Sequence, residues 1–536
     1  MINKIKKVIS VTKSEKHNPI YDTCMYWSQK AFNINSLLIE AFTKRGDIIF
    51  DPFMGSGVTI IEAVSDKLSR KAIGSEINEA PIFMVNTILK KHNIDAIDKL
   101  RELCLELTKY SHTLYGTKCV ECGNQTSVNT VVFDIVGLNK IIKILNYRCS
   151  NASCKCKSKE PDDFDYNMMD FEYELKNIEN IELIYNSKIA VKENMHIFDI
   201  FTRRNLKALD IIIELKKTKY YCISDLIDYI LLSMIHLCKI TDTHSNSQWP
   251  LWIPKNNCVE KNVFNIFVRK VDKIEKYFEY MKNNYKKVKL VDSFEKLEKS
   301  NQYMIISKGT QKIDNSDIPD NSVDFILTDP PYMGQVLYSE YMQLYKPFLN
   351  FNFNLEDEIV VSSAPSRIKK ENDYFKLLKD AFEICSKKIK NNHIMCLYFH
   401  DCNLNVWNKL INILYSVGFE YITQIHIDKT ITLKNIISPK KSLNGDSVLF
   451  FIKKEGLEMF NKKQWSDDIE MNIYLEAKSM LSNGPLTTPE LYDNGLMEII
   501  IQNGWLEVLA KKYKTLVEIF EKYFIWESVT GRWKNK

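Results

Sequence analysis

The sequence predicts an α/β protein in which helices cover a parallel sheet. Two stretches of the chain predict this fold. Residues 47–75 alternate a short apolar segment, a glycine-rich turn, a helical pattern and a second apolar segment, which is the pattern of a βαβ unit. Residues 303–454 contain four more apolar segments, with two amphipathic stretches of helical period among them. Neither stretch has enough strands to close a sheet alone, so we expect one sheet built from both.

The elements follow one another in a regular order. In the first stretch we expect a helix over residues 35–42, a strand over 47–50, a helix that ends near Val64 and a strand over 71–75. In the second stretch we expect strands over residues 323–327, 394–398, 421–425 and 447–452, and helices over 374–390 and 406–417. This alternation of short strands and helices is the pattern of a parallel sheet that helices cover.

The chain has 536 residues, which predicts two to four domains because a domain usually contains roughly 100–200 residues. We expect residues 1–95 and 301–454 to form the two parts of the α/β core. Residues 96–300 contain a cysteine cluster and then a mainly helical stretch, and we interpret them as an insertion into that core. Residues 455–536 predict a small helical module.

Composition and charge exclude some classes of protein. Hydrophobic residues make up 45% and charged residues 26%, which excludes a wholly disordered or fibrous chain. No segment approaches the ~20 consecutive apolar residues of a membrane span, and the N-terminus lacks the features of a secretory signal. We therefore expect a cytoplasmic protein without a membrane partner. The net charge of +5 permits nucleic-acid binding without requiring it.

A strand end followed by glycines predicts a cofactor site. The segment Asp47-Ile-Ile-Phe-Asp-Pro-Phe-Met-Gly-Ser-Gly-Val-Thr59 runs from a strand through Gly55 and Gly57 into a helix, whose N-terminus presents N–H groups to a ligand. An ordinary βα turn also fits this segment alone. Glu76 favours the cofactor site, because nucleoside-binding folds place an acid there to bond the ribose hydroxyls. Ile60 replaces the third glycine of dinucleotide motifs, which favours a cofactor without pyrophosphate, such as S-adenosylmethionine.

A second strand end predicts a site for an amino group. The strand over residues 323–328 leads directly into Asp329-Pro-Pro-Tyr332. The prolines donate no N–H, so we expect their carbonyls to accept hydrogen bonds from a ligand beside the Asp329 carboxylate. Tyr332 adds an aromatic face. Together these groups suit a planar ring that carries an NH2 group, such as a flipped-out nucleobase.

These motifs resemble those of a known family. Asp51-Pro-Phe-Met-Gly-Ser-Gly57 and Asp329-Pro-Pro-Tyr332 are similar to the cofactor-binding and catalytic motifs of the DNA amino-methyltransferases, which methylate adenine N6 or cytosine N4 with S-adenosylmethionine. Upstream, Gln29-Lys-Ala31 is similar to the Gln-Lys-Pro element of the family. The runs Val336-Leu-Tyr-Ser-Glu340 and Arg203-Arg-Asn-Leu206 most resemble adenine-specific methylases with a zinc-ribbon insertion. The resemblance implies a Rossmann-like, seven-stranded methyltransferase sheet.

The resemblance also implies roles for individual residues. It implies catalytic roles for Asp329, Pro330, Pro331 and Tyr332, and cofactor binding by Gln29, Lys30, Asp51, Pro52, Phe53, Gly55, Gly57, Thr59 and Glu76. The acid that the family places beside the adenine of the cofactor has no counterpart in Ile306-Ser-Lys-Gly-Thr310, and that position stays unassigned.

The function that the resemblance implies is methylation of adenine N6 in double-stranded DNA. The implied setting is restriction-modification or phage defence, with a restriction endonuclease or another defence subunit as partner. The alternatives are the same chemistry on cytosine N4, on RNA or on a glutamine side chain, and a non-enzymatic, zinc-containing nucleic-acid-binding protein.

Clustered cysteines predict a structural zinc site within residues 117–158. Cys119-Val-Glu-Cys-Gly123 has the spacing of a zinc knuckle, whose turn directs two sulfurs at one metal ion. For the second pair we assign Cys149 and Cys154, with Cys156 as the alternative to Cys154. Residues 128–135 and 140–148 predict the two strands of a ribbon. Scattered, reduced cysteines are the other interpretation.

Two further features of the insertion fit either DNA contact or an ordinary structural role. Lysines spread around residues 269–289 fit phosphate contact or a solvated helix face. Trp249 and Trp252, which follow His244 and Gln248, fit DNA contact or core packing.

Overall fold

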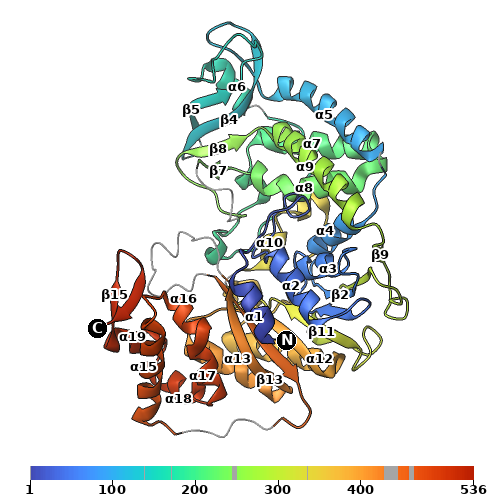
Figure 1. Ribbon diagram of the computed structural model, residues 1–536. Coiled ribbons are helices and arrows are strands. Elements are labelled where there is room, and N and C mark those ends of the chain that lie inside the picture. The colour runs from blue at the N-terminus through green and yellow to red at the C-terminus, as the bar shows by residue number, and fades with distance from the viewer. Residues whose placement is uncertain are drawn as a thin grey trace.

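The computed structural model confirms the α/β prediction (Figure 1). The structure describes residues 2–93, 95–137, 139–170, 172–243, 250–334, 336–427, 445–457 and 464–536. It contains a large core sheet, a second sheet within the insertion, and a C-terminal helical module. His244, Gln248 and Trp249 lie outside the described residues. The domain boundaries stay predictions.

The core sheet has the six strands that the sequence predicts individually, a seventh, β10, that the resemblance implies only by number, and one short addition. Its order is β13-β14-β12-β11-β1-β2-β10-β9. The strands are β1 (Ile48–Asp51), β2 (Lys71–Ser75), β10 (Gln302–Ile306), β11 (Val323–Thr328), β12 (Ile389–Phe399), β13 (Phe419–Ile427) and β14 (Asp446–Lys453), and the addition is β9 (Lys289–Leu290) at the edge. Neighbouring strands from β9 to β12 run parallel, whereas β14 is antiparallel to β12 and β13.

Helices cover both faces of this sheet. One layer contains α2 (Phe32–Phe42), α3 (Val58–Ala63) and α4 (Glu79–Leu89), and the other contains α12 (Glu371–Lys388) and α13 (Leu404–Ser416). Successive strand residues alternate between the layers: Ile49 and Phe325 pack on the α2 side, and Phe50 and Ile326 pack on the α12 side. Because both faces are covered, apolar side chains are needed on both sides of the sheet, and the polar residues of β1 and β11 lie near the strand ends.

The insertion has its own sheet and helices, at the top of Figure 1. Its strands are β3 (Gly116–Lys118), β4 (Gln125–Val136), β5 (Asn139–Tyr147), β6 (Ser158–Lys159), β7 (Thr241–Asp242) and β8 (Cys258–Lys261). Its helices are α5 (Asp95–Leu114), α6 (Asp163–Asp170), α7 (Arg203–Thr218), α8 (Ser224–Cys238) and α9 (Val263–Asn284). The two ribbon strands that the sequence predicts are β4 and β5, which pair antiparallel. One hydrophobic core runs from α2–α4 into this insertion.

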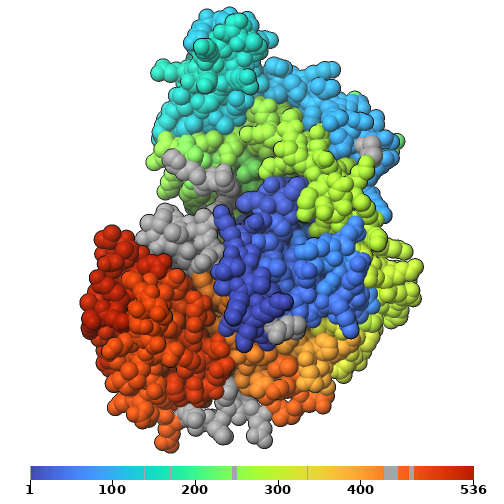
Figure 2. All heavy atoms as spheres, viewed as in Figure 1, coloured from blue at the N-terminus to red at the C-terminus, as the bar shows by residue number. Residues whose placement is uncertain are grey.

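The C-terminal module covers the edge of the core sheet beside β13. It consists of α15 (Asp467–Leu481), α16 (Thr488–Leu491), α17 (Met497–Gln502), α18 (Leu506–Lys512), α19 (Val517–Tyr523) and an additional hairpin, β15 (Phe524–Glu527) with β16 (Arg532–Asn535). The N-terminal helix α1 (Ile2–Ser10) reaches the same edge, where Lys6 donates to Thr423 of β13 (2.7 Å) and pairs with Glu498 of the module (3.3 Å). Figure 2 shows this N-terminal segment in blue beside the orange and red module.

Among the described residues, one helical stretch, Tyr221–Cys238, has the length and composition to cross a membrane. Of that stretch, 67% is buried within the protein, and α8, which makes up most of it, packs against α4, α7 and α9. This apolar stretch is therefore packed inside the insertion.

A buried ion pair joins α7 to the insertion sheet. Arg204 is 2% exposed and Glu260, on β8, is 1% exposed. The guanidinium contacts the Glu260 carboxylate through two nitrogens, of which Nε lies 3.2 Å from Oε1. The guanidinium also lies 4.8 Å from the centre of the Tyr115 ring. The Arg-Arg-Asn-Leu run thus has a structural role in the insertion.

We predict that Arg204→Met or Glu260→Met destabilises the insertion. Each change leaves one buried charge without its partner, which typically costs about 3–5 kcal/mol of unfolding free energy. The double variant should lose less than the sum of the two single losses, because neither charge remains. Urea denaturation with limited proteolysis of the insertion measures the losses.

The exposed pair Lys219–Glu106 provides the control. Lys219→Met should leave the free energy of unfolding nearly unchanged, because surface ion pairs contribute little to stability. Additive losses in the double variant of Arg204 and Glu260 would show that the buried pair is not coupled.

Candidate active site

A pocket of about 920 Å³ lies at the carboxyl ends of the core strands. β1 lies between β2 and β11. The chain continues from β1 to β2 on one side, and it adds β11 on the other side of β1 only after the insertion. Ligands of open α/β sheets bind outside the strand ends at such a switch point.

The pocket collects most of the residues that the sequence predicts. Nine of them line it: Lys30, Asp51, Pro52, Phe53, Gly55, Thr59, Glu76, Asp329 and Pro331. Gln29, Gly57, Pro330 and Tyr332 are not among the lining residues. The cofactor motif and the catalytic motif therefore face one common space.

Gly57 serves packing and does not line the pocket. Its φ of 71° is left-handed, and a Cβ atom there would lie 2.4 Å from Cγ2 of Val85 on α4. Glycine at this position lets α3 start close to α4. Gly55 differs, because it lines the pocket and its backbone N–H donates to the Glu76 carboxylate (3.0 Å).

Glu76 is fixed at the end of β2 by backbone donors. Its carboxylate accepts hydrogen bonds from the N–H groups of Gly55 (3.0 Å), Ile77 (2.9 Å) and Asn78 (2.9 Å). Burial raises the pKa of Glu76 to about 7, against these donors, which favour the charged form. A ligand that donates hydrogen bonds to this carboxylate would bind its ionised form better.

Asp51 links the two strands that carry the motifs. Its carboxylate ends β1 and accepts hydrogen bonds from the Thr328 hydroxyl at the end of β11 (2.7 Å) and from the Phe53 N–H (3.2 Å). Burial raises the pKa of Asp51 to about 6. The bond to Thr328 places the glycine turn beside Asp329, which is the next residue after β11.

The Asp329 carboxylate is held from two sides. The Tyr332 hydroxyl donates to its Oδ1 (2.7 Å), and the Lys30 ammonium lies 2.9 Å from its Oδ2. The same ammonium lies 3.4 Å from Oδ2 of Asp446. Burial disfavours the charge on Lys30, but the carboxylates of Asp329 and Asp446 outweigh it and hold the pKa of Lys30 above its ordinary value. The Lys30 ammonium thus lies at the Asp329 carboxylate, although the resemblance implies that Lys30 has a role at the cofactor.

The two proline carbonyls of the catalytic turn differ. The sequence predicts that both accept from a ligand, but the Pro331 carbonyl accepts from the Tyr374 hydroxyl (2.7 Å). This leaves the Pro330 carbonyl as the acceptor that no described residue occupies. Pro330 itself is buried.

Several pocket residues come from segments without a readable motif. Examples are Tyr26, Asn35, Thr310, Asp357, Glu358 and Tyr398. Asp357 and Glu358 bring acids to the pocket, whereas the stretch after β10 offers none. The Asp357 carboxylate pairs with Lys312 (2.6 Å), and Glu358 pairs with Arg367 (2.5 Å). Only Tyr338 had a sequence signal, because it lies in the Val-Leu-Tyr-Ser run.

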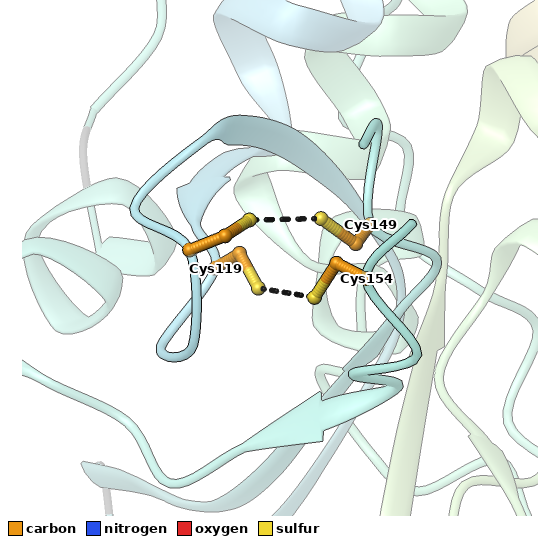
Figure 3. A group of neighbouring side chains, drawn as sticks. Cys119, Cys149 and Cys154 are labelled. Atoms are coloured by element: carbon orange, nitrogen blue, oxygen red, sulfur yellow. Dashed lines mark hydrogen bonds between the residues drawn. The ribbon is translucent and has the colours of Figure 1, made fainter. Parts of the chain in front are cut away.

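Four cysteine sulfurs converge in the insertion, away from this pocket. The sulfurs of Cys119, Cys122, Cys149 and Cys154 all lie within 4.8 Å of one another. Figure 3 shows Cys119 and Cys154 facing each other, with Cys149 beside them. The distances are 3.6 Å from Cys119 to Cys154 and 3.4 Å from Cys122 to Cys149. Zn–S bonds of about 2.3 Å in a tetrahedron separate the sulfurs by roughly 3.8 Å, so the spacing fits zinc.

Cys156 lies outside this cluster. Its sulfur lies 3.1 Å from the Tyr147 hydroxyl and 3.4 Å from the Ser158 carbonyl. Between the two alternatives for the fourth ligand, the geometry therefore favours Cys154.

Comparisons with known proteins point to DNA methylases. Residues 3–85 match the family described as DNA methylase. The type II methyltransferase M.MjaII of Methanocaldococcus jannaschii is 25% identical over 333 residues, which are 56% of this chain and 58% of the relative. The chain thus spans less than two-thirds of the length of this relative.

Two solved structures overlap parts of the chain. A candidate DNA modification methylase of Thermus thermophilus has 10% identity and a TM-score of 0.15, and the overlap covers 32% of this chain and 70% of the methylase chain. A candidate class I S-adenosylmethionine-dependent methyltransferase of Listeria monocytogenes has 10% identity and a TM-score of 0.17, and covers 39% of this chain and 49% of its own. Overlaps with TM-scores this low add nothing to the assignment. The matches of sequence, by contrast, confirm the resemblance to DNA methylases that the motifs predict.

Proposed function

We propose that this protein is an S-adenosylmethionine-dependent methyltransferase that acts on adenine N6 in double-stranded DNA. The observation that carries the proposal is the common pocket of Glu76 and Asp329, the two acids to which we assign ribose binding and amine binding. The match of residues 3–85 to DNA methylases supports it.

The residues of the pocket fit the cofactor. Glu76 offers a carboxylate to the ribose hydroxyls, and Asp51 with Phe53 and Gly55 forms the turn beside it. The pocket is rich in buried carboxylates, which suit a cationic sulfonium ligand. Gln29 is assigned to the cofactor by resemblance alone.

The residues of the catalytic turn would act on the target base. A base that leaves the duplex reaches Asp329 through the open side of the pocket and stacks on an aromatic face, for which Tyr332 is the nearest ring of the turn. The Asp329 carboxylate and the Pro330 carbonyl would accept hydrogen bonds from the exocyclic amine. These bonds favour a more tetrahedral nitrogen, whose lone pair is less delocalised into the ring.

The transfer itself needs orientation and electrostatic stabilisation rather than a covalent enzyme intermediate. When bound, S-adenosylmethionine supplies an electrophilic methyl group, whose bond to sulfur breaks with its electron pair leaving on sulfur as the bond to the amine nitrogen forms. The nitrogen then carries an extra positive charge, and it becomes neutral by losing one proton. The Asp329 carboxylate would be the base that accepts that proton before it passes to solvent.

The proposed target atom is N6 of adenine rather than N4 of cytosine. The initial Asp of Asp329-Pro-Pro-Tyr332 favours adenine over cytosine. Incubation of the protein with methyl-labelled cofactor and DNA, RNA or protein, followed by nucleoside analysis, tests this. Label in N6-methyladenine of DNA is the expected result, whereas label in N4-methylcytosine, RNA or glutamine identifies one of the alternatives. Absence of cofactor binding in calorimetry would favour a non-enzymatic nucleic-acid-binding protein.

The proposed setting is a cytoplasmic restriction-modification or defence system with a partner endonuclease. The type II methyltransferase among the relatives supports this setting. Sequencing of methylated bases in cells that express the protein would report the modified base and its sequence context. Methylation at one short sequence is the expected pattern.

We also propose that Cys119, Cys122, Cys149 and Cys154 hold one structural zinc ion. The convergence of their sulfurs supports it. The four thiolates leave no open position for a substrate, so the ion would stabilise the ribbon at the end of β4 and β5 and would take no part in catalysis.

We predict that cofactor affinity depends on Glu76 and on pH. Glu76→Ala should weaken binding of S-adenosylmethionine roughly ten- to a hundredfold, because a carboxylate that bonds both ribose hydroxyls contributes about 1.5–3 kcal/mol in total. Because the pKa of Glu76 is about 7, protonation at lower pH removes the charged acceptor. Wild-type affinity should therefore rise roughly tenfold from about pH 6 to about pH 8, as calorimetry measures.

Glu76→Gln should bind weakly and lose most of this pH dependence. Glu62→Gln is the matched control, because Glu62 is also a buried acid but bonds to Tyr21 and Ser36 instead of facing the pocket. Unchanged affinity in folded Glu76→Ala would remove Glu76 from the cofactor site.

We predict about one zinc ion per chain in freshly prepared, reduced protein. The double variant Cys119→Ser and Cys122→Ser should lose the metal and loosen the insertion, while the core sheet still binds cofactor. Cys156→Ser should keep the metal, because its sulfur lies outside the cluster. Metal analysis by mass spectrometry measures all three proteins. A metal-free wild type, or zinc loss in Cys156→Ser, would contradict the assignment.

We predict that Asp329→Ala abolishes methyl transfer and leaves cofactor affinity nearly intact. The carboxylate makes a bond that strengthens as charge grows on the amine, and losing such a bond costs on the order of a hundredfold or more in rate. Asp329→Asn keeps an acceptor oxygen without the charge and should retain partial activity. Single-turnover assays with calorimetry separate the two effects.

Asp324→Asn is the control on the same strand, because Asp324 lies at the opposite end of β11 and bonds the Ile48 N–H (2.8 Å). It should methylate at nearly the wild-type rate. A wild-type rate in Asp329→Ala, or a defect limited to cofactor binding, would exclude Asp329 from catalysis.

A further inference from the structure

A buried ammonium is shared by two carboxylates beside the proposed catalytic centre. Lys30 is 7% exposed and Asp446 is 2% exposed. The Lys30 Nζ atom lies 2.9 Å from Oδ2 of Asp329 and 3.4 Å from Oδ2 of Asp446. The rings of Tyr332 and Tyr398 flank it, with centres 5.5 Å and 5.1 Å from Nζ. In so apolar a surrounding, the position of one positive charge strongly affects both carboxylates.

Asp446 reaches this cluster from the antiparallel strand. It is the first residue of β14, and because β14 runs opposite to β12, its start lies at the edge where the parallel strands end. Asp446 does not line the pocket, and the Lys30 ammonium is the group that contacts both Asp446 and Asp329. Two further titratable groups face Asp446: His400, whose Nδ1 lies 3.6 Å from its Oδ1, and Lys16, which interacts with it electrostatically.

Both oxygens of Asp329 already have partners in this structure. Oδ1 accepts from the Tyr332 hydroxyl, and Oδ2 pairs with Lys30. An incoming amine therefore competes with the ammonium for Oδ2. A second carboxylate on the far side of the ammonium lowers the cost of that competition, because Lys30 can move toward Asp446 without losing an ionic partner.

We propose that Asp446 is a positioning residue that holds the Lys30 ammonium and so makes the Asp329 carboxylate available to the target amine. This inference rests on the proposed function. Under this proposal, the charges of Lys30 and Asp446 contribute to the site together with the Asp329 carboxylate.

Removing the charge of Asp446 and removing the charge of Lys30 change the net charge of the cluster in opposite directions. Asp446→Asn leaves the ammonium to Asp329 alone, which weakens Asp329 as an acceptor for the amine. Lys30→Met leaves two carboxylates close together in an apolar site, which favours protonation of one of them. The double variant leaves Asp329 with its Tyr332 bond and neither excess charge. Two harmful changes should therefore partly cancel.

The test compares wild type, Asp446→Asn, Lys30→Met and the double variant. Each single change should lower kcat for DNA methylation roughly tenfold, equivalent to about 1.4 kcal/mol, and the double variant should exceed both single variants. Calorimetry with S-adenosylmethionine separates a defect in cofactor binding. Asp493→Asn is the matched control, because Asp493 is a buried acid that pairs with His426 on β13 (2.7 Å). Adding Lys30→Met to Asp493→Asn should not raise kcat above that of Lys30→Met alone.

A second readout does not require methyl transfer. A water-soluble carbodiimide modifies protonated carboxyl groups, and the Asp329 side chain is 20% exposed, so the reagent can reach it. Peptide mass spectrometry should find slower modification of Asp329 in Asp446→Asn and faster modification in Lys30→Met, with the double variant between them.

The outcomes separate the two proposals. A wild type that methylates no substrate would refute the proposed function, and the carbodiimide rates would then still decide whether Asp446 acts on Asp329 through Lys30. Losses in kcat that multiply in the double variant, or equal modification rates in all four folded proteins, would overturn the inference.

Discussion

The pairing of β1 with β11 is the constraint on which the candidate active site depends. These strands come from opposite sides of the insertion, and Ile49 pairs with Phe325 in register. The register sets the distance between Asp51 and Thr328, which are 277 residues apart and share a hydrogen bond of 2.7 Å. A slip of one residue would exchange the two faces of β11 and bury its apolar side chains in the wrong layer. Packing of both layers therefore also aligns the two motifs.

A chain of buried hydrogen bonds beneath the pocket strengthens this alignment. The Tyr398 hydroxyl donates to Asn35 (2.6 Å), the Asn35 amide donates to Thr59 (3.2 Å), and the Thr59 hydroxyl donates to the Leu327 carbonyl (3.3 Å). The chain connects β12, α2, α3 and β11. Because buried polar groups are costly without partners, each member restricts the next. Helix α2 is thereby tied to β11, which explains why Lys30, just before α2, can reach Asp329.

The sequence predicts those parts of the fold and site that local patterns determine. Continuously apolar strands mark a sheet buried on both faces, and residues at strand ends, such as Asp51, Glu76 and Asp329, follow from the geometry of parallel sheets. Local patterns do not show which distant side chains meet. Asp446 starts an antiparallel strand and carries no motif, and the hairpin β15–β16 was predicted as part of a helical module. Gly57 was predicted to admit a ligand, but its small size accommodates Val85 instead, a contact between two helices that only tertiary packing reveals.

The charges of the pocket bear on turnover under the proposed function. Asp51 and Glu76 are 4% and 9% exposed, and burial raises the pKa of each. A cationic sulfonium beside them would stabilise their ionised forms, since an opposite charge at short range lowers the pKa of a carboxyl group. Methyl transfer converts the sulfonium to a neutral thioether, and this stabilisation is then lost. The buried carboxylates that favour binding of the cationic cofactor would therefore bind its neutral product less tightly. Burial of these acids thus contributes to cofactor binding before the transfer and to product release after it.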